Sequence, residues 1–411
     1  MMRPALDRRS LLRAGLAAML ALLPLATAGA APRVDWLSLA RGAVPVALGG
    51  AAQALGLGMS QALAAIDEAP QGFVLTLKPG PADTSFVIVV ELPAATTFDS
   101  FAIPNVLETP SPSQTFVKDV VIAGSAAGRD GPFDELARVT LATHPSKGEA
   151  TEFAAAVRKP VRWLRLTLAG GIRVERDKTF LEFSEIAGYG TQEPVPMSTA
   201  FSGKWQARGV KLALQQDGVR VSGCYDDDGE LQGTVGGPLL LATGKSRKSG
   251  VPSAFVLSVD SRGAIFGVRS TNGAPFKLYG GDSASALKMA CAGQAVAPLG
   301  CGAVVHGIQF DFDSAAIRPA SKPHLDALHD GLRAAPATSI TVVGHTSSEG
   351  AQAYNDELSQ RRAEAVVAAL RERGIAAGRL AAQGRGEQQP IADNATEAGR
   401  ALNRRVEIAC R

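Results

Sequence analysis

The chain has 411 residues, of which 46% are hydrophobic and 20% charged, with 42 Lys and Arg against 39 Asp and Glu. This length predicts two or three domains. The near balance of charge argues against a protein that coats nucleic acid or an anionic membrane, because both of those partners attract a basic excess. We therefore expect no nucleic-acid partner.

Residues 1–30 have the layout of a cleaved export signal. Basic residues precede an apolar run from about Gly15 to Leu25, and small residues at 28–30 follow it. The run is shorter than the ~20 residues of a membrane-spanning helix. The pair Arg8-Arg9 resembles a twin-arginine signal, and an ordinary Sec signal is the alternative. Cleavage removes four of the 42 basic and one of the 39 acidic residues, which leaves 38 of each.

All four cysteines lie beyond residue 220, and their even number suits an oxidising compartment. The spacing alone does not fix their pairing. We expect Cys224 to pair with Cys291 and Cys301 with Cys410, because each bridge then stays within one predicted domain.

Residues 31–190 predict an all-β sandwich, because short β-rich runs alternate there with turn residues. In one of these runs Leu164, Leu166 and Leu168 share a face, which we assign to the core. The predicted strands are Gly72–Leu77, Ser85–Leu92, Ser100–Ile103, Phe116–Ala123, Arg138–Ala142, Val161–Leu168 and Thr179–Ile186.

A further pattern in this region consists of Ala65–Asp67, Phe86–Leu92 with Phe98–Phe101, Val120–Ser125 and Arg162–Leu168. Together these segments resemble a discoidin-like (coagulation-factor type C) jelly roll over about residues 33–190. Domains of that family often bind glycans or phospholipid head groups through loops at one end of the sandwich. The resemblance implies a second binding surface, and a spacer domain without a ligand is the alternative.

Residues 191–199 and 292–302 have the composition of linkers. Between them, residues 200–291 predict a small antiparallel barrel or sandwich. The predicted strands are Gly203–Trp205, Lys211–Gln215, Val219–Tyr225, Leu231–Val235, Ser253–Val259, Ile265–Ser270 and Phe276–Tyr279.

Hairpin turns are expected at Gln216–Gly218 and Asp227–Gly229. The acidic run Asp226–Glu230 lacks the alternating oxygen ligands and the closing glutamate of a calcium loop. We therefore expect solvated acids at a hairpin tip, and no bound metal.

Residues 303–411 alternate between strand and helix patterns, which predicts an α/β sandwich. One helix carries Leu325, Leu328 and Leu332 on one face, and a longer helix runs over Asn355–Arg373. The predicted strands are Ile308–Phe312, Ser339–Gly344 and Arg404–Cys410.

Arg362 falls in the middle of the apolar stripe of the longer helix. At 100° per residue, Leu358 and Leu370 lie on either side of it, and Arg361 lies off the stripe. A buried arginine loses its hydration unless an anionic partner replaces the water. The position therefore indicates an anion site, and the alternative is that the stem packs while the guanidinium reaches solvent.

Six motifs follow one another in this region: Phe310–Ser314, Gly344–Thr346, Tyr354–Ala363, Gly384–Glu387, Pro390 and Asn403–Ile408. Together they resemble the OmpA-like peptidoglycan-binding domain. The resemblance implies that the domain holds the diaminopimelate side chain of the stem peptide, and that Arg362 takes the ligand carboxylate. A planar guanidinium suits that role because it donates two parallel hydrogen bonds.

One position departs from the family pattern. The family usually has Asp after Gly-His-Thr, as the expected partner of the ligand's ammonium or backbone amide, and Ser347 stands there. A neutral serine lowers the expected affinity by ~1–2 kcal/mol unless Glu349 supplies the acid. For Asn355, the sequence favours helix capping over contact with the ligand. For Arg405, a charge at the end of a strand is the alternative to ligand contact. The candidate ligand-binding residues are Arg362, Ser347, Glu349, Asn355, Arg405 and Phe312.

Neither catalysis nor a cofactor is expected, because the sequence has no metal-binding histidine pair, nucleophile elbow or phosphate-binding loop. The sequence predicts a non-catalytic protein that binds peptidoglycan. We expect it in the periplasm, associated with the cell wall, and the outer membrane is a second candidate for association. Its β domains would present a second surface to glycan, lipid or an outer-membrane protein. A peptidoglycan or glycan hydrolase with an anchoring tail, and an envelope scaffold that has lost wall binding, are the alternatives.

Overall fold

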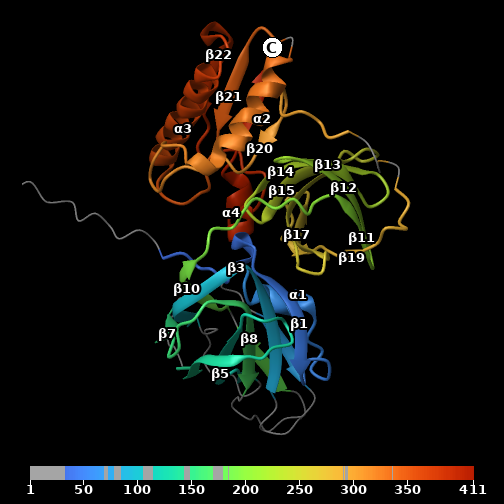
Figure 1. Ribbon diagram of the computed structural model, residues 1–411, viewed down its shortest axis with the longest axis vertical. Coiled ribbons are helices and arrows are strands. Elements are labelled where there is room, and N and C mark those ends of the chain that lie inside the picture. Colours follow the sequence, from blue (N-terminus) through green and yellow to red (C-terminus); the bar gives the residue numbers. More distant parts are fainter. Residues whose placement is uncertain are drawn as a thin grey trace, which may run out of the picture. The chain divides into compact units, whose positions relative to one another are not determined.

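The structure, a computed structural model, describes residues 33–68, 73–77, 85–104, 114–142, 149–169, 179–183, 185–289, 291, 295–335 and 337–411. Strands dominate up to residue 283, and strands alternate with helices from residue 304 onward (Figure 1). The predicted export signal lies outside the described residues. Within these ranges, no helix is long and apolar enough to cross a membrane.

The first antiparallel sheet consists of β1 (Val44–Gly50), β3 (Ser85–Pro104), β5 (Asp119–Ser125), β6 (Asp134–Thr140), β7 (Ala150–Ala154), β8 (Val161–Ala169) and β10 (Ala187–Gln192). Its path runs β1-β3-β8-β5-β6, and the second half of β3 also pairs with β7 and β10. Leu164, Leu166 and Leu168 are fully buried, which confirms the predicted core face of β8. A smaller sheet and two short helices accompany it: β2 (Phe73–Leu77), β9 (Thr179–Phe183), β4 (Gln114–Phe116), η1 (Leu39–Arg41) and α1 (Met59–Ala64).

The predicted strands Ser85–Leu92 and Ser100–Ile103 are one strand in the structure. The pairing of β3 with β8 shifts register between Glu91 and Thr96, and the strand continues past the irregularity. The sequence did not predict β1, β7 or β10. The discoidin-like jelly roll and the domain boundaries stay predictions.

The next sheet is a meander of β11 (Gly203–Ala207), β12 (Val210–Asp217), β13 (Arg220–Tyr225), β14 (Gly229–Gly236), β15 (Leu239–Ser246), β16 (Pro252–Val259), β17 (Ile265–Thr271), β18 (Lys277–Leu278) and β19 (Asp282–Ser283). β19 pairs with β11 at one edge of the sheet, and an isolated bridge between Gly281, directly before β19, and Ile265 of β17 joins that edge to the other, so the antiparallel sheet closes into a barrel. Trp205, Tyr225 and Phe255 are buried in its core. Gly229 and Gly244 leave room for the Tyr225 ring, since a Cβ on either would lie within 2.6 Å of it.

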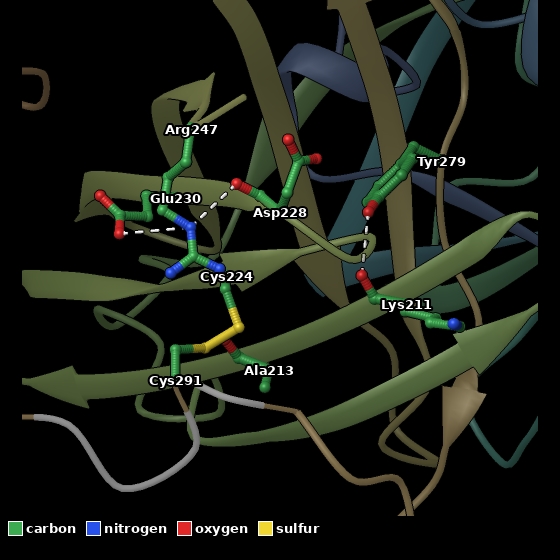
Figure 2. The surroundings of a disulfide bond; sticks show 8 residues. All are labelled: Lys211, Ala213, Cys224, Asp228, Glu230, Arg247, Tyr279 and Cys291. Carbon is green, nitrogen blue, oxygen red and sulfur yellow. Dashed lines mark hydrogen bonds and ion pairs between the residues drawn. A yellow bond between two sulfur atoms is a disulfide. The ribbon is translucent and has the colours of Figure 1, made fainter. Parts of the chain in front are cut away.

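Both disulfides are those that the sequence predicts. Cys224 on β13 is bonded to Cys291 (Figure 2), and Cys301 is bonded to Cys410. The acidic hairpin beside the first bridge joins β13 to β14, where the Asp228 carbonyl accepts a hydrogen bond from Arg247 Nε at 3.2 Å.

The C-terminal region contains β20 (Val304–Val305), η2 (Pro319–Ser321), α2 (Lys322–Arg333), β21 (Ile340–Gly344), α3 (Gln352–Glu372), η3 (Ala377–Arg379), β22 (Leu380–Gly384), α4 (Glu397–Asn403) and β23 (Val406–Cys410). The sheet order is β20-β23-β21-β22, and only β21 and β22 run parallel among these described strands. Leu325, Leu328 and Leu332 of α2 are buried, as predicted. Gly374 follows α3 with φ of 101°, a conformation that glycine adopts without strain.

The predicted strand Ile308–Phe312 is wrong. The ladder strand β20 ends at Val305, and the chain then turns so that Phe310 forms an isolated bridge with Ile317. Asp313 at this turn has φ of 52°. The turn carries Phe312 to the surface, which breaks the alternation that favoured a strand.

Candidate functional site

Arg362 lies on the same side of α3 as the buried residues Val366 and Leu370. Its own side chain is half-buried. Its Nε donates a hydrogen bond to the Ser314 carbonyl oxygen at 3.1 Å, and its Cζ lies 4.9 Å from the centre of the Phe310 ring. These two contacts orient the plane of the guanidinium.

Arg362 has no ion-pair partner among the described residues, although the charge of Asp313 raises its pKa. By contrast, Arg361 Nη1 lies 2.5 Å from Glu357 Oε1. Burial lowers the pKa of Arg362, and the charge of Arg404 acts in the same direction. A half-buried guanidinium whose two terminal nitrogens lack an acidic partner can bind a carboxylate.

Ser347 lies in the loop between β21 and α3 and is 5% exposed. Its Oγ donates to Glu349 Oε2 at 2.9 Å. The Glu349 carboxylate also lies 3.4 Å from Arg404 Nη1 and 3.8 Å from Arg400 Nε. The structure therefore joins the two candidate residues Ser347 and Glu349, and it balances the charge of Glu349 with two arginines.

Asn355 does not cap α3, so the capping role that the sequence favoured for it is wrong. The helix begins at Gln352 with Ala351 as its N-cap residue, one turn before Asn355. Asn355 is 2% exposed, and its Nδ2 donates to the Glu349 carbonyl at 3.1 Å and to Glu387 Oε2 at 2.5 Å. The side chain thus connects the Ser347 loop to the loop after β22.

Arg405, directly before β23, is 4% exposed and is matched by an internal acid. Its Nη2 lies 2.6 Å from Glu407 Oε1 and donates to the Gln389 carbonyl at 2.9 Å. Burial, followed by the charge of Arg405, lowers the pKa of His345 to about 4, so this ring is neutral near pH 7. The contact of Arg405 with a ligand stays a prediction.

Phe312 is 66% exposed in the turn that precedes Ser314, the hydrogen-bond partner of Arg362. The exposure of a large aromatic ring near Arg362 is compatible with a wall of the site. Its contact with a ligand also stays a prediction.

Several residues that hold the candidate side chains were not among the predicted site residues. Four of them lie in the quoted motifs, which could have singled them out, and Arg400 lies outside every motif. They are Phe310, Ser314, Glu387, Arg400 and Arg404.

The site combines a guanidinium fork, a buried hydroxyl and a charge-balanced carboxylate, which suits binding by hydrogen bonds. Ser347, the hydroxyl among the candidates, donates its proton to the Glu349 carboxylate at 2.9 Å. Across the described ranges, no group of three or more His, Cys, Asp or Glu side chains is arranged to hold a metal ion.

Comparison with known proteins finds an OmpA family domain at residues 309–404, a range that contains five of the six candidate residues and ends before Arg405. The chain is 51% identical to outer membrane porin F of Pseudomonas fluorescens over 102 residues, which are 25% of this chain and 31% of that protein. It is 43% identical to the peptidoglycan-binding protein ArfA of Mycobacterium tuberculosis over 101 residues, again 25% of this chain and 31% of that protein. The chain thus spans about a third of the length of these curated relatives.

Among solved structures, the peptidoglycan-associated lipoprotein of Burkholderia pseudomallei is 33% identical. The match covers 25% of this chain and 88% of that one, with a TM-score of 0.24.

Proposed function

With the OmpA family domain at residues 309–404 as the premise, we propose that this chain is a non-catalytic cell-envelope protein that binds peptidoglycan non-covalently. Its ligand group is the side-chain carboxylate of diaminopimelate in the stem peptide, and Arg362 receives it. The observation that carries the proposal is the guanidinium of Arg362, which is held by Ser314 and Phe310 and makes no ion pair in the described chain. The names of two relatives, a peptidoglycan-binding protein and a peptidoglycan-associated lipoprotein, support it.

The guanidinium of Arg362 is oriented before a ligand arrives. Arg362 has already lost part of its hydration, and its plane is fixed before a ligand arrives. A carboxylate then gains two parallel charge-assisted hydrogen bonds at a reduced cost in side-chain entropy. A lysine would offer a point charge without that geometry.

Ser347 and Glu349 form the other half of the proposed site. Because Arg404 and Arg400 balance the charge of Glu349, we assign Glu349 an indirect role, in which it acts on the ligand through the Ser347 hydroxyl. Asn355 supports the loop through the Glu349 carbonyl. Arg405 and Phe312 border the same proposed site.

The β-rich regions before residue 303 are proposed to present a second surface to glycan, lipid or an outer-membrane protein. The compartment that fits these assignments is the periplasm, with the protein attached to the cell wall and in reach of the outer membrane. Outer-membrane names among the relatives support that location. The two disulfides suit an oxidising compartment.

The test is a pull-down of the full-length protein on purified sacculi. Wild type is expected to sediment with the sacculi, and Arg362→Ala to remain in solution. Arg361→Ala is the matched control, because Arg361 is the neighbouring arginine on α3 and pairs with Glu357.

Equal sedimentation of wild type and Arg362→Ala would remove Arg362 from the binding site. A wild type that does not sediment would favour the scaffold that has lost wall binding. Zymography of the same samples tests the hydrolase alternative, since a clear band would show cleavage of the wall.

A further inference from the structure

Ser347 offers a ligand an uncharged hydrogen-bond acceptor. Its hydroxyl proton is donated to Glu349 Oε2 at 2.9 Å. A hydroxyl has one proton and two lone pairs, so Ser347 Oγ can then only accept from a ligand. The ligand group that meets Ser347 is therefore an N–H donor.

Glu349, the acid that accepts the Ser347 proton, is paired with two arginines. Arg404 Nη1 and Arg400 Nε lie 3.4 and 3.8 Å from the Glu349 carboxylate. Both arginines also hold Glu397, and Arg400 Nε lies 2.7 Å from its Oε2. Arg400 Nη2 also lies 3.4 Å from Glu68 Oε2, so three carboxylates share these two guanidiniums, and both arginines offset the charge that Glu349 presents to a ligand.

The charges that act on Arg362 also favour an anionic ligand group. Burial has the largest effect on the pKa of Arg362 and lowers it, and Arg404 and Arg361 lower it further. Asp313 is the acid that raises it. Because Arg361 and Arg404 have acidic partners of their own and Arg362 has none among the described residues, Arg362 is the cation that favours a ligand group with net negative charge.

Building on the proposed function, we infer that this site prefers diaminopimelate whose amine is acylated, as in a peptide cross-link, over diaminopimelate with a free amine. The terminal carbon of the free form carries a carboxylate and an ammonium, which sum to zero charge. Acylation leaves the carboxylate for Arg362 and converts the ammonium into one amide N–H. A neutral Ser347 oxygen satisfies that N–H, whereas a desolvated ammonium requires an anionic partner.

Glu387 is the acid that opposes this inference. Its Oε2 accepts from Asn355 Nδ2 at 2.5 Å, and it pairs with no cation among the residues that the structure describes. An ammonium that reached Glu387 would restore a preference for the free amine. Glu387→Gln therefore belongs in the test.

The test titrates the full-length protein with two synthetic tripeptides. One is L-Ala-γ-D-Glu-diaminopimelate with a free terminal amine, and the other carries an acetyl group on that amine. Wild type and Glu387→Gln are both expected to bind the acetylated peptide at least about threefold more tightly. Ser347→Asp places a charge beside the ligand nitrogen and is expected to reverse the preference to about tenfold in favour of the free amine.

Equal or tighter binding of the free-amine peptide by wild type overturns the inference. If Glu387→Gln then removes that preference, the ammonium belongs to Glu387. Wild type that binds neither peptide at millimolar concentration overturns the proposed function itself. If Ser347→Asp does not fold, the ratio of the two wild-type affinities decides alone.

Discussion

Helix α3 carries the half-buried Arg362, and the buried Arg405 lies directly before strand β23; the surroundings of the two arginines differ in one respect. Arg405 lies 2.6 Å from Glu407 Oε1, so its charge is matched within the protein. Arg362 contacts a carbonyl oxygen and an aromatic ring, and no carboxylate of the described chain pairs with it. An arginine that meets an internal acid stabilises the fold, whereas one that lacks an acid is available to an external anion.

The largest expected effect comes from Arg405→Ala. It leaves Glu407 in a partly buried position without its guanidinium, and we expect a loss of roughly 3–5 kcal/mol in the free energy of unfolding. Denaturant unfolding of the full-length protein measures this loss. Arg362→Ala should change the same free energy by less than about 1 kcal/mol, since no internal acid loses its partner.

The double variant Arg405→Ala with Glu407→Ala is the control, and it should recover part of the lost stability. A stability loss in Arg362→Ala as large as in Arg405→Ala would break the comparison between the two arginines.

The second prediction concerns the bridge at the end of β23. Replacing Cys301 and Cys410 by Ser opens a loop of 109 residues and should lower the stability of the C-terminal region by about 2–4 kcal/mol. Peptide binding below the melting temperature should persist, because α3 is not part of the bridge. The matched control replaces Cys224 and Cys291, which close a loop of 67 residues at the barrel. Loss of binding by the folded Cys301 and Cys410 variant would mean that β23 contributes to the site.

The third prediction extends the comparison to a buried acid. Asp35 accepts hydrogen bonds from the backbone N–H groups of Leu37 and Gly188 and makes no ion pair in the described chain. Burial is the main cause that raises its pKa from 3.8 to about 7. Because the folded pKa lies above the unfolded one, ionisation of Asp35 destabilises the fold as the pH rises between these values.

The unfolding free energy should therefore fall by roughly 2 kcal/mol between pH 5 and pH 8. Asp35→Asn keeps an oxygen for the two N–H groups and should reduce this slope. The slope should not vanish, because burial also raises the pKa of Glu185. Thermal melting at the two pH values measures the effect, and an unchanged slope in Asp35→Asn would reject Asp35 as its source.

The smallest expected effect is that of Arg362→Lys. The charge remains, but the two parallel hydrogen bonds to a carboxylate are lost, so affinity for a diaminopimelate peptide should fall about tenfold. Arg361→Lys is the matched control and should bind as wild type does. Full affinity in Arg362→Lys would show that charge alone, without the planar fork, accounts for binding.

Periodicity predicted those elements that bury one regular face. Leu325, Leu328 and Leu332 recur at helical spacing, and α2 follows; Val406 and Ile408 alternate, and β23 follows. The elements β15, β22 and α4 were missed. β22 contains small residues and Gly384, and its extended form depends on parallel pairing with β21, which local sequence does not display.

The candidate site shows the same limit. The position of Arg362 in an apolar stripe follows from spacing, but its partners come from distant parts of the chain. The Ser314 carbonyl is 48 residues away, and Arg404 reaches Glu349 across 55 residues. Alternation also predicted a strand through Phe312, whereas a turn at Asp313 places Phe312 at the surface. Whether an arginine such as Arg362 or Arg405 has an acidic partner depends on tertiary contacts, which the local sequence pattern does not display.

The central claim is tested most directly by calorimetric titration of the full-length protein with a diaminopimelate-containing tripeptide, with wild type and Arg362→Ala measured side by side. We predict saturable binding by wild type and an affinity at least about a hundredfold lower in Arg362→Ala, with both proteins folded. Equal affinities, or no binding by wild type at millimolar peptide, would contradict the assignment of Arg362 as the carboxylate-binding residue.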